Sequence, residues 1–193
     1  MKKDPRIYLA IDNCFASKRW TSPNEWMKVI HEIGIRYVEA SADTECDPLY
    51  MGTAFIRDWI WEVKQESKSY GIEVINLYSG HGTYSTLGLS HYDSRVRERF
   101  RDNWLKTQAD TAKVLGAGLG FFAHAFSDRV LQDHGLYRSK LAELYTSLAD
   151  LAVYAQQIDL RSISVEQMYA PHQPPWTIAG TKELLREVYM QSG

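Results

Sequence analysis

The sequence predicts a parallel α/β fold: a (β/α)8 barrel of which this chain carries the first five β/α units. Short apolar segments typical of buried strands alternate five times with amphipathic segments typical of helices, and Gly residues follow several of the helices. The long polar loops follow the strands and not the helices. That arrangement favours a barrel, whose functional loops gather on one face, over a doubly wound open sheet.

The first unit pairs an apolar strand with a clearly marked helix. The strand is predicted at Ile7–Ile11, an uninterrupted apolar run of the kind that is buried on both faces. Asp12-Asn13-Cys14 follows it in place of a Gly-rich phosphate turn, which argues against a dinucleotide-binding fold. The helix is predicted to begin at Ser22-Pro23-Asn24-Glu25, which combines an N-cap, an early proline and a capping box, and to end at Gly34.

The other four units repeat this order. Four further strands are predicted as short, largely apolar runs: Ile35–Glu39, Ile72–Leu77, Leu119–Ala123 and Arg161–Glu166. Each is followed by a predicted helix with apolar residues at helical spacing: near Phe55–Tyr70 (a stripe that includes Phe55), from about Val96 to Leu115, from a cap at Ser139 to about Ala155, and near Lys182–Gln191. No linker or change in composition divides the chain, so we expect one domain over residues 1–193.

Composition limits the classes of function. The net charge of −2 gives no electrostatic footprint for nucleic acid. Asp12 interrupts the first apolar run, which is too short for a signal peptide, and no later run could span a bilayer. The two cysteines, Cys14 and Cys46, are too few for a disulfide framework. We therefore expect a cytoplasmic protein without nucleic-acid or membrane partners, with a homo-oligomer as an open option.

Glu166 is the most informative residue for function. It ends the fifth predicted strand, and in a closed parallel barrel the strand ends all point to the mouth where chemistry is done. A carboxylate at that place is a candidate metal ligand or a candidate acid or base. A Pro-rich loop with His172 and Trp176 follows it.

Three segments at strand ends carry a more specific pattern. They are Tyr78-Ser-Gly-His81-Gly, Gly116-Ala-Gly-Leu-Gly-Phe-Phe-Ala-His124 and Val165-Glu166-Gln-Met-Tyr-Ala-Pro-His172. In unit order over nearly the whole chain, they resemble the xylose-isomerase-like TIM-barrel superfamily. Its members include sugar isomerases, ketose 3-epimerases and apurinic endonucleases of the endonuclease IV type.

The resemblance implies a divalent-metal site at the barrel mouth, with Mn²⁺ as the first choice and Mg²⁺, Co²⁺ or Zn²⁺ as alternatives. Glu166 matches the position of the first ligand. The family's other ligands, an Asp, a His and a second Glu, come from strands six to eight, and the sequence ends at Gly193 before a sixth strand. Five units in this length scale to roughly 300 residues for eight, so we expect the sequence to be about two thirds of a family member.

Four aromatic residues are candidates for contact with substrate: His81, His124, His172 and Trp176. His81 lies between two glycines that let the loop turn the imidazole toward the mouth. His124 ends the fourth predicted strand, and Trp176 could stack on the face of a sugar ring. Each also has a structural alternative, as a histidine bonded to a turn or an aromatic anchor for a loop.

Together the residues and the resemblance predict a divalent-metal-dependent sugar or sugar-acid isomerase or epimerase. The reaction would pass through an enediolate stabilised by the cation, with Glu166 as both metal ligand and proton-transfer residue. One alternative is a zinc-dependent phosphodiesterase of the apurinic-endonuclease type, with His81 and His124 as further ligands. Another is a non-catalytic barrel fragment, and a decarboxylase with the same enediolate chemistry would look identical in these residues.

Overall fold

The computed structural model describes residues 7–80 and 87–193 and contains a five-stranded parallel sheet in the order β1-β2-β3-β4-β5. The strands are β1 (Ala10–Asp12), β2 (Tyr37–Ser41), β3 (Glu73–Tyr78), β4 (Gly118–Phe121) and β5 (Ile163–Val165). The strand order follows the chain without reversal, as in a (β/α) barrel, whereas a doubly wound sheet reverses its order. The predicted fold, a barrel represented by its first five β/α units, is confirmed.

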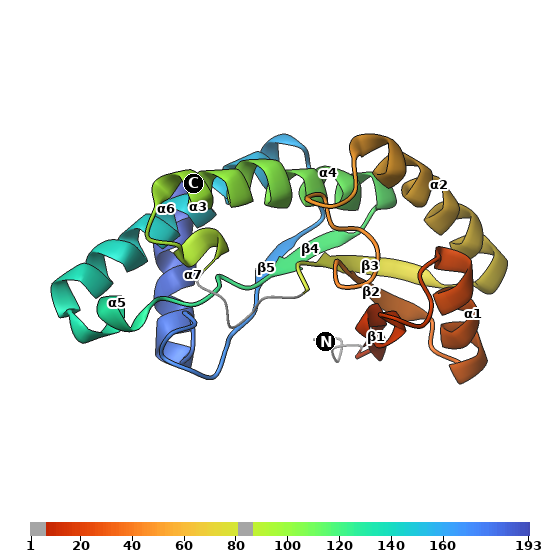
Figure 1. The fold of residues 1–193 in the computed structure, drawn as a ribbon, viewed down its shortest axis with the longest axis horizontal. Coiled ribbons are helices and arrows are strands. Elements are labelled where there is room, and N and C mark those ends of the chain that lie inside the picture. Colours follow the sequence, from red (N-terminus) through yellow and green to blue (C-terminus); the bar gives the residue numbers. More distant parts are fainter. Residues whose placement is uncertain (1–6, 81–86) are drawn as a thin grey trace, which may run out of the picture.

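Helical segments connect consecutive strands and cover one face of the sheet. They are η1 (Asn13–Ala16), α1 (Pro23–Ile33), α2 (Thr53–Tyr70), η2 (Gly88–Ser90), α3 (Ser94–Arg99), the π-helical η3 (Phe100–Leu105), α4 (Lys106–Leu115), α5 (Asp128–Gln132), α6 (His134–Gln157) and α7 (Ile178–Ser192). In Figure 1, α2 and α4 lie along one face, with α1 at the β1–β2 end and α6 and α7 at the β5 end. No helix of the described residues is both long and apolar enough to cross a membrane.

Local sequence signals set the ends of the first two connecting helices. The Ser22 hydroxyl accepts a hydrogen bond from the Glu25 N–H, and the Glu25 carboxylate accepts one from the Ser22 N–H at 3.1 Å, so the predicted capping box of α1 is confirmed. Gly34 and Gly71 follow α1 and α2 with φ of 84° and 67°. Side chains rarely adopt this left-handed conformation, which explains why glycine ends both helices.

The first strand is shorter and more exposed than the sequence predicts. The prediction of a strand buried on both faces from Ile7 is wrong, because β1 begins at Ala10, and Ile7 and Leu9 are 91% and 75% exposed. β1 lies at the edge of the described sheet and pairs only with β2. An apolar run at such an edge has a partner on one side only, so its side chains stay accessible.

The helix after β4 begins earlier than predicted. Asp133, not Ser139, caps α6, and its carboxylate accepts hydrogen bonds from the N–H groups of Gly135 and Leu136 at 2.8 and 2.9 Å. Ser139 lies inside the helix. Both residue types are good N-caps, and α6 begins six residues earlier than a cap at Ser139 would give.

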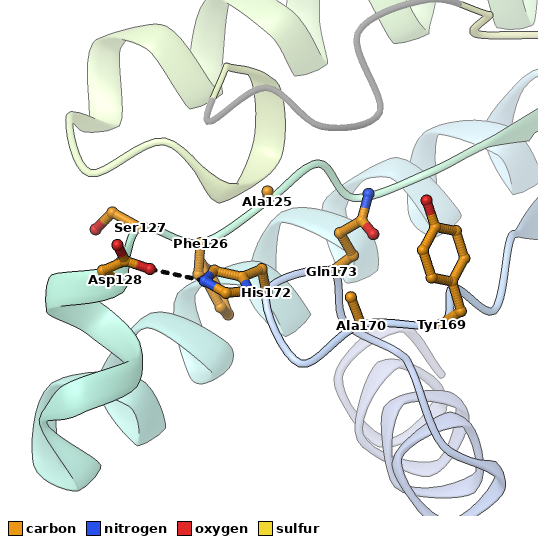
Figure 2. A pocket seen from close by; sticks show the side chains of 8 residues that line it. All are labelled: Ala125, Phe126, Ser127, Asp128, Tyr169, Ala170, His172 and Gln173. Carbon is orange, nitrogen blue, oxygen red and sulfur yellow. Dashed lines mark hydrogen bonds and ion pairs between the residues drawn. The ribbon is translucent and has the colours of Figure 1, made fainter.

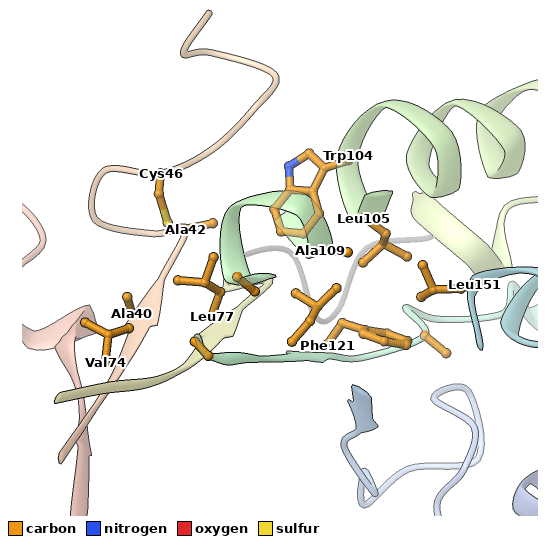
Figure 3. Packing of buried hydrophobic residues seen from close by; sticks show 14 of the residues in the cluster. Ala40, Ala42, Cys46, Val74, Leu77, Trp104, Leu105, Ala109, Phe121 and Leu151 are labelled. Carbon is orange, nitrogen blue, oxygen red and sulfur yellow. The ribbon is translucent and has the colours of Figure 1, made fainter. Parts of the chain in front are cut away.

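The main core lies between the sheet and its covering helices, as Figure 3 shows. Leu77 of β3 and Leu119 of β4 are fully buried there, against Leu105, Ala109 and Leu151 from the helices. Alanines on both sides let the helices approach the sheet closely, while the larger side chains fill the space between them. The helices therefore bury one face of the sheet, and the other face remains for polar side chains.

The loop after β2 is buried and is held by side chains from three helices. Trp26 of α1 donates its indole N–H to the Glu45 carboxylate, and Trp104 of η3 donates its indole N–H to Asp47 Oδ1 at 2.9 Å. The Gln108 amide of α4 donates to the Cys46 carbonyl oxygen. Burial raises the pKa of the Cys46 thiol to about 12, so this cysteine is a neutral packing residue.

Burial also raises the pKa of Glu45 to about 7, against an ordinary value of 4.5. The folded protein therefore holds a proton on Glu45 that the unfolded chain releases, and the free energy of unfolding should fall as pH rises from about 4.5 through 7. This decline in the free energy of unfolding, up to about 3 kcal/mol at pH 8, should be absent in the Glu45→Gln variant. Urea unfolding of both proteins between pH 5 and 8 measures the difference, and parallel curves would contradict the assignment.

Leu119→Ala should lower the free energy of unfolding by about 2–5 kcal/mol, because it leaves a cavity in the middle of the core. Urea denaturation measures the change. Leu185→Ala is the matched control on α7, where the side chain is 58% exposed. The free energy of unfolding of the control should fall by less than about 1 kcal/mol. Equal losses of stability in the two variants would contradict the location of the core around Leu119.

Candidate functional site

The face of the sheet away from the main core is polar near the strand ends. Asp12 ends β1, Glu39 lies in β2 and Asn76 in β3, and the strand register pairs Asp12 with Glu39 and Glu39 with Asn76. Tyr78 shares the face of Asn76 because side chains alternate along a strand. Glu166 directly follows β5, where its N–H donates to a carbonyl oxygen of β4 at 2.9 Å. We call these five residues the polar face.

Two hydrogen bonds connect side chains within the polar face. Asn76 Nδ2 donates to Glu39 Oε2, and the Tyr78 hydroxyl donates to Glu166 Oε2. The second bond joins β3 to the end of β5, so the Tyr78 side chain must pass over the intervening strand β4. It holds one oxygen of the carboxylate that the sequence singled out.

Two glycines of β4 make room for the Asn76 and Tyr78 side chains. A Cβ atom on Gly120 would lie 2.6 Å from Asn76 Nδ2 and 2.9 Å from Tyr78 Cδ2. A Cβ atom on Gly118 would lie 3.0 Å from Asn76 Oδ1. Any side chain at these positions would collide with its neighbours, which is a recognised reason for glycine inside a strand.

The three carboxylates of the polar face disfavour one another's charge. Burial raises the pKa of each, most clearly through loss of water around Asp12 and Glu39. The charge of Asp12 raises the pKa of Glu39 and of Glu166 further, and the charge of Glu166 also acts on Glu39. A cation close to these groups would offset the repulsion and lower all three pKa values.

His172 lies in a separate cavity of about 470 Å³ between the loops that follow β4 and β5 (Figure 2). Its Nε2 is 2.8 Å from Asp128 Oδ1. The His172 carbonyl oxygen accepts a hydrogen bond from the Phe126 N–H at 2.6 Å, which ties the two loops together. Tyr169 and Gln173 also line this cavity, so its wall offers a carboxylate, an imidazole, an amide and a phenol to a ligand rich in hydroxyl groups.

Trp176 lines a second cavity of about 260 Å³, whose other walls come from α6 and α7. Tyr137, Tyr145 and Glu183 give this cavity its polar lining. Trp176 is 41% exposed. The structure therefore places Trp176 and His172, neighbours in the sequence, in different cavities.

His124 is buried beneath η2. It has a φ of 63° and its ring lies 4.8 Å from the Phe100 ring and 4.6 Å from the Phe122 ring, centroid to centroid. A Cβ atom on Gly88 would lie 2.3 Å from His124 Nδ1, so the backbone of η2 rests directly on the imidazole. This surrounding is that of a packed core histidine, while a role in substrate binding stays a prediction. His81 lies outside the described residues.

The predicted site residues that the structure describes thus do not form one cluster. Glu166 belongs to the polar face, His172 and Trp176 to two cavities, and His124 to the packing under η2. Asp12, Asn76 and Tyr78 were not predicted from the sequence as parts of the site. The strand-end rule that identified Glu166 applies equally to Asp12, and the alternation of side chains in the third strand could have identified the other two.

Comparison with known proteins comes from a family model and from solved structures. The model described as xylose isomerase-like TIM barrel matches residues 27–191. No curated protein sequence matches the chain. A candidate xylose isomerase from Rhodospirillum rubrum ATCC 11170 is similar in structure, with a TM-score of 0.84, 18% identity and coverage of 95% of this chain and 62% of that chain.

Two epimerases are similar as well. The 3-keto-D-glucoside 4-epimerase from E. coli has a TM-score of 0.68, 15% identity and coverage of 95% of this chain and 65% of that chain. The D-psicose 3-epimerase from Clostridium cellulolyticum H10 has a TM-score of 0.67, 14% identity and coverage of 94% and 60%. Such low identities show a shared fold, and this chain spans less than two thirds of the length of each of these structures.

Gly120→Ala should break the link between Tyr78 and Glu166, because the new methyl group collides with the Asn76 and Tyr78 side chains. We expect a loss of about 1–3 kcal/mol in the free energy of unfolding and a displaced Tyr78 ring in a crystal structure. Gly52→Ala is the control, since no atom lies within 4 Å of its Cβ position. An unchanged Tyr78–Glu166 contact in Gly120→Ala would show that β4 does not need glycine there.

Proposed function

The chain belongs to the xylose isomerase-like TIM barrel family, and we propose that it is a divalent-metal-dependent isomerase or epimerase of a sugar or sugar acid. The reaction would proceed through an enediolate. Glu166 would move the proton on the carbon next to the substrate carbonyl. The observation that supports this role is the place of its carboxylate, at the C-terminal end of β5 and under the hydroxyl of Tyr78.

The surroundings of Glu166 suit a base. The residue is exposed, so a substrate can reach it. Burial of part of the carboxylate and the charge of Asp12 raise its pKa above the usual range, and a higher pKa makes the carboxylate a stronger base. The hydrogen bond from Tyr78 fixes the direction in which the carboxylate faces, which a general base needs for transfer over a short distance.

The negative charge of the polar face suits a metal ion, and Glu166 would supply one oxygen donor to it. Mn²⁺ is the cation we favour, with Mg²⁺, Co²⁺ or Zn²⁺ as alternatives. Carboxylate oxygens suit all four, and the mutual repulsion of Asp12, Glu39 and Glu166 favours a cation nearby. Within residues 7–80 and 87–193 no group of three or more His, Cys, Asp or Glu side chains could hold a metal ion. When bound, the cation would supply Lewis-acid polarisation of the carbonyl.

The cavity around His172 is the proposed place for part of the substrate. Asp128 lies 2.8 Å from the imidazole and so orients it. A carbohydrate presents alternating hydroxyl donors and acceptors, which match the carboxylate of Asp128, the imidazole and the Gln173 amide on the cavity wall. Contacts from His81, His124 and Trp176 to the substrate stay predictions.

The similar structures support the reaction class. A 3-epimerase and a 4-epimerase of keto sugars are among them, and both names describe a change at a sugar carbon. A carboxylate at a strand end, beside two further carboxylates whose repulsion a cation would offset, suits such chemistry. The activity of the whole protein, its sugar substrate, a cytoplasmic location and a homo-oligomer all remain parts of the proposal.

Glu166→Gln should reduce proton exchange at the substrate carbon by about 100-fold or more, the usual contribution of a general base. The amide keeps the size of the carboxylate and still accepts the Tyr78 hydrogen bond. The measurement is deuterium incorporation from D₂O into a panel of ketoses and aldoses with Mn²⁺, followed by NMR.

Glu98→Gln, at an exposed position on α3, is the control and should exchange at the wild-type rate. Tyr78→Phe removes only the orienting hydroxyl, so it should be slower than wild type and faster than Glu166→Gln. Equal exchange by wild type and Glu166→Gln would exclude Glu166 as the base. No exchange by a wild-type protein that carries the complete barrel, with any of the four metals and the whole panel, would exclude the isomerase reaction itself.

A further inference from the structure

The cavity between the loops after β4 and β5 has a wall of one-sided charge. This is the cavity of about 470 Å³ that contains His172 (Figure 2). Among the described residues, Asp128 and His172 are the only titratable groups on the wall besides the phenol of Tyr169, and no Lys or Arg side chain lines it. The side chains of Asp128 and His172 are 83% and 43% exposed, so a ligand in the cavity can reach both.

Backbone hydrogen bonds fix the two loops that carry this pair. The Phe126 N–H donates to the His172 carbonyl oxygen at 2.6 Å, which joins the segment that leads to Asp128 to the loop after β5. The Gln173 N–H donates to the Ala170 carbonyl oxygen at 2.9 Å and closes the turn in which His172 lies. The position of the pair therefore depends on the backbone of both loops as well as on its own side-chain contact.

Asp128 determines which nitrogen of His172 is the hydrogen-bond donor. Its Oδ1 lies 2.8 Å from His172 Nε2, and an ionised carboxylate can only accept hydrogen bonds. Nε2 therefore carries a proton, and Nδ1 of the neutral imidazole remains as an acceptor. The pair thus presents carboxylate and imidazole acceptors, which suit the hydroxyl donors of a ligand.

A phosphate or a carboxylate of a ligand would lack partners in this cavity. Such anions only accept hydrogen bonds, and proteins bind them with Arg, Lys or free N–H groups at a helix start. The described wall offers no Arg or Lys. Asp128 is the first residue of α5 and already brings a negative charge to the start of that short helix. An anion in the cavity would therefore be repelled by the Asp128 carboxylate.

The rest of the wall suits the carbon skeleton of a sugar. Ala125, Phe126, Tyr169 and Ala170 contribute to it, and Tyr169 is 67% exposed. Aromatic side chains offer large apolar ring faces, against which the C–H groups of a sugar can pack. Figure 2 shows Tyr169 and Asp128 at opposite ends of this wall. One end therefore suits hydroxyl groups and the other end suits carbon.

We propose that this cavity takes an uncharged, hydroxyl-bearing end of the substrate, and that Asp128 rejects phosphate esters and sugar acids at that end. The inference rests on the proposed function for the identity of the ligand as a sugar, and it narrows that ligand to a free sugar. Hydroxyl groups donate to the Asp128 carboxylate and to His172 Nδ1. Asp128 is thus a specificity-determining residue and takes no part in the proton transfer at Glu166.

Binding of D-fructose, D-tagatose and D-psicose to the full chain, each compared with its 6-phosphate, tests this selectivity. Calorimetry and the imidazole C–H signals of His172 in NMR follow binding without any turnover, and no metal is added because phosphate would itself bind it. We expect each free ketose to shift the His172 signals and to bind at least about tenfold more tightly than its phosphate, since like charges oppose association. In about 1 M salt, where the Debye length falls to about 3 Å, this preference should shrink.

Variants at Asp128 identify the source of the preference. Asp128→Asn keeps the size of the side chain and an oxygen acceptor for His172 Nε2 but removes the charge, so the two ligands should bind with nearly equal affinity. Asp128→Lys should reverse the preference in favour of the phosphate. Glu98→Gln removes the same charge at an exposed position of α3 outside the cavity, and it should bind like wild type.

The proposal is overturned if wild type binds the phosphates as tightly as the free ketoses, or if Asp128→Asn keeps the wild-type preference. It is also overturned if no free ketose shifts the His172 signals. Failure of the proposed reaction would look different. A protein with the complete barrel that prefers free ketoses but shows no deuterium exchange would contradict the reaction and leave the selectivity in place, whereas exchange confined to phosphate esters would contradict the selectivity alone.

Discussion

The close approach of the Tyr78 and Asn76 side chains to β4 is the constraint on which the polar face depends. Tyr78 reaches Glu166 because β4 carries no side chain at Gly120, and Asn76 lies against both Gly118 and Gly120. The parallel register brings Asp12, Glu39 and Asn76 into one row, and the Tyr78 hydrogen bond connects Glu166 to the strand at the end of that row. The geometry of the site therefore depends on glycine at positions 118 and 120 as much as on the groups that carry its chemistry.

The units of the fold could be predicted from the sequence because each has a local cause. The capping box at Ser22 and the glycine stop at Gly71 act within one helical turn, and they appear in the structure where the pattern places them. The exposure of Ile7 could not be predicted in this way, because a hydrophobic run does not reveal whether a neighbouring strand covers it. The cap at Asp133 was missed because Ser139 is also a good N-cap residue type, and sequence alone does not decide between the two positions.

For the site, the sequence identified Glu166 from its place at a strand end but could not supply its partner. Tyr78 lies 88 residues away, and their contact depends on the order of β3, β4 and β5 in the sheet. The histidines show the opposite difficulty. His124 and His172 both follow strands, yet one is packed between aromatic rings and the other lines a cavity beside Asp128. Residue type and spacing are the same in such cases, so burial decides between them.

The anchoring of the loop after β2 has a consequence for the order in which the chain folds. Asp47 accepts a hydrogen bond from the Trp104 indole, which lies 57 residues later in the sequence. During synthesis from the N-terminus, the second β/α unit therefore leaves the ribosome before the indole that anchors its loop to η3. That unit can reach its final packing only after the third unit has emerged, so the two are expected to form a single cooperative step of folding.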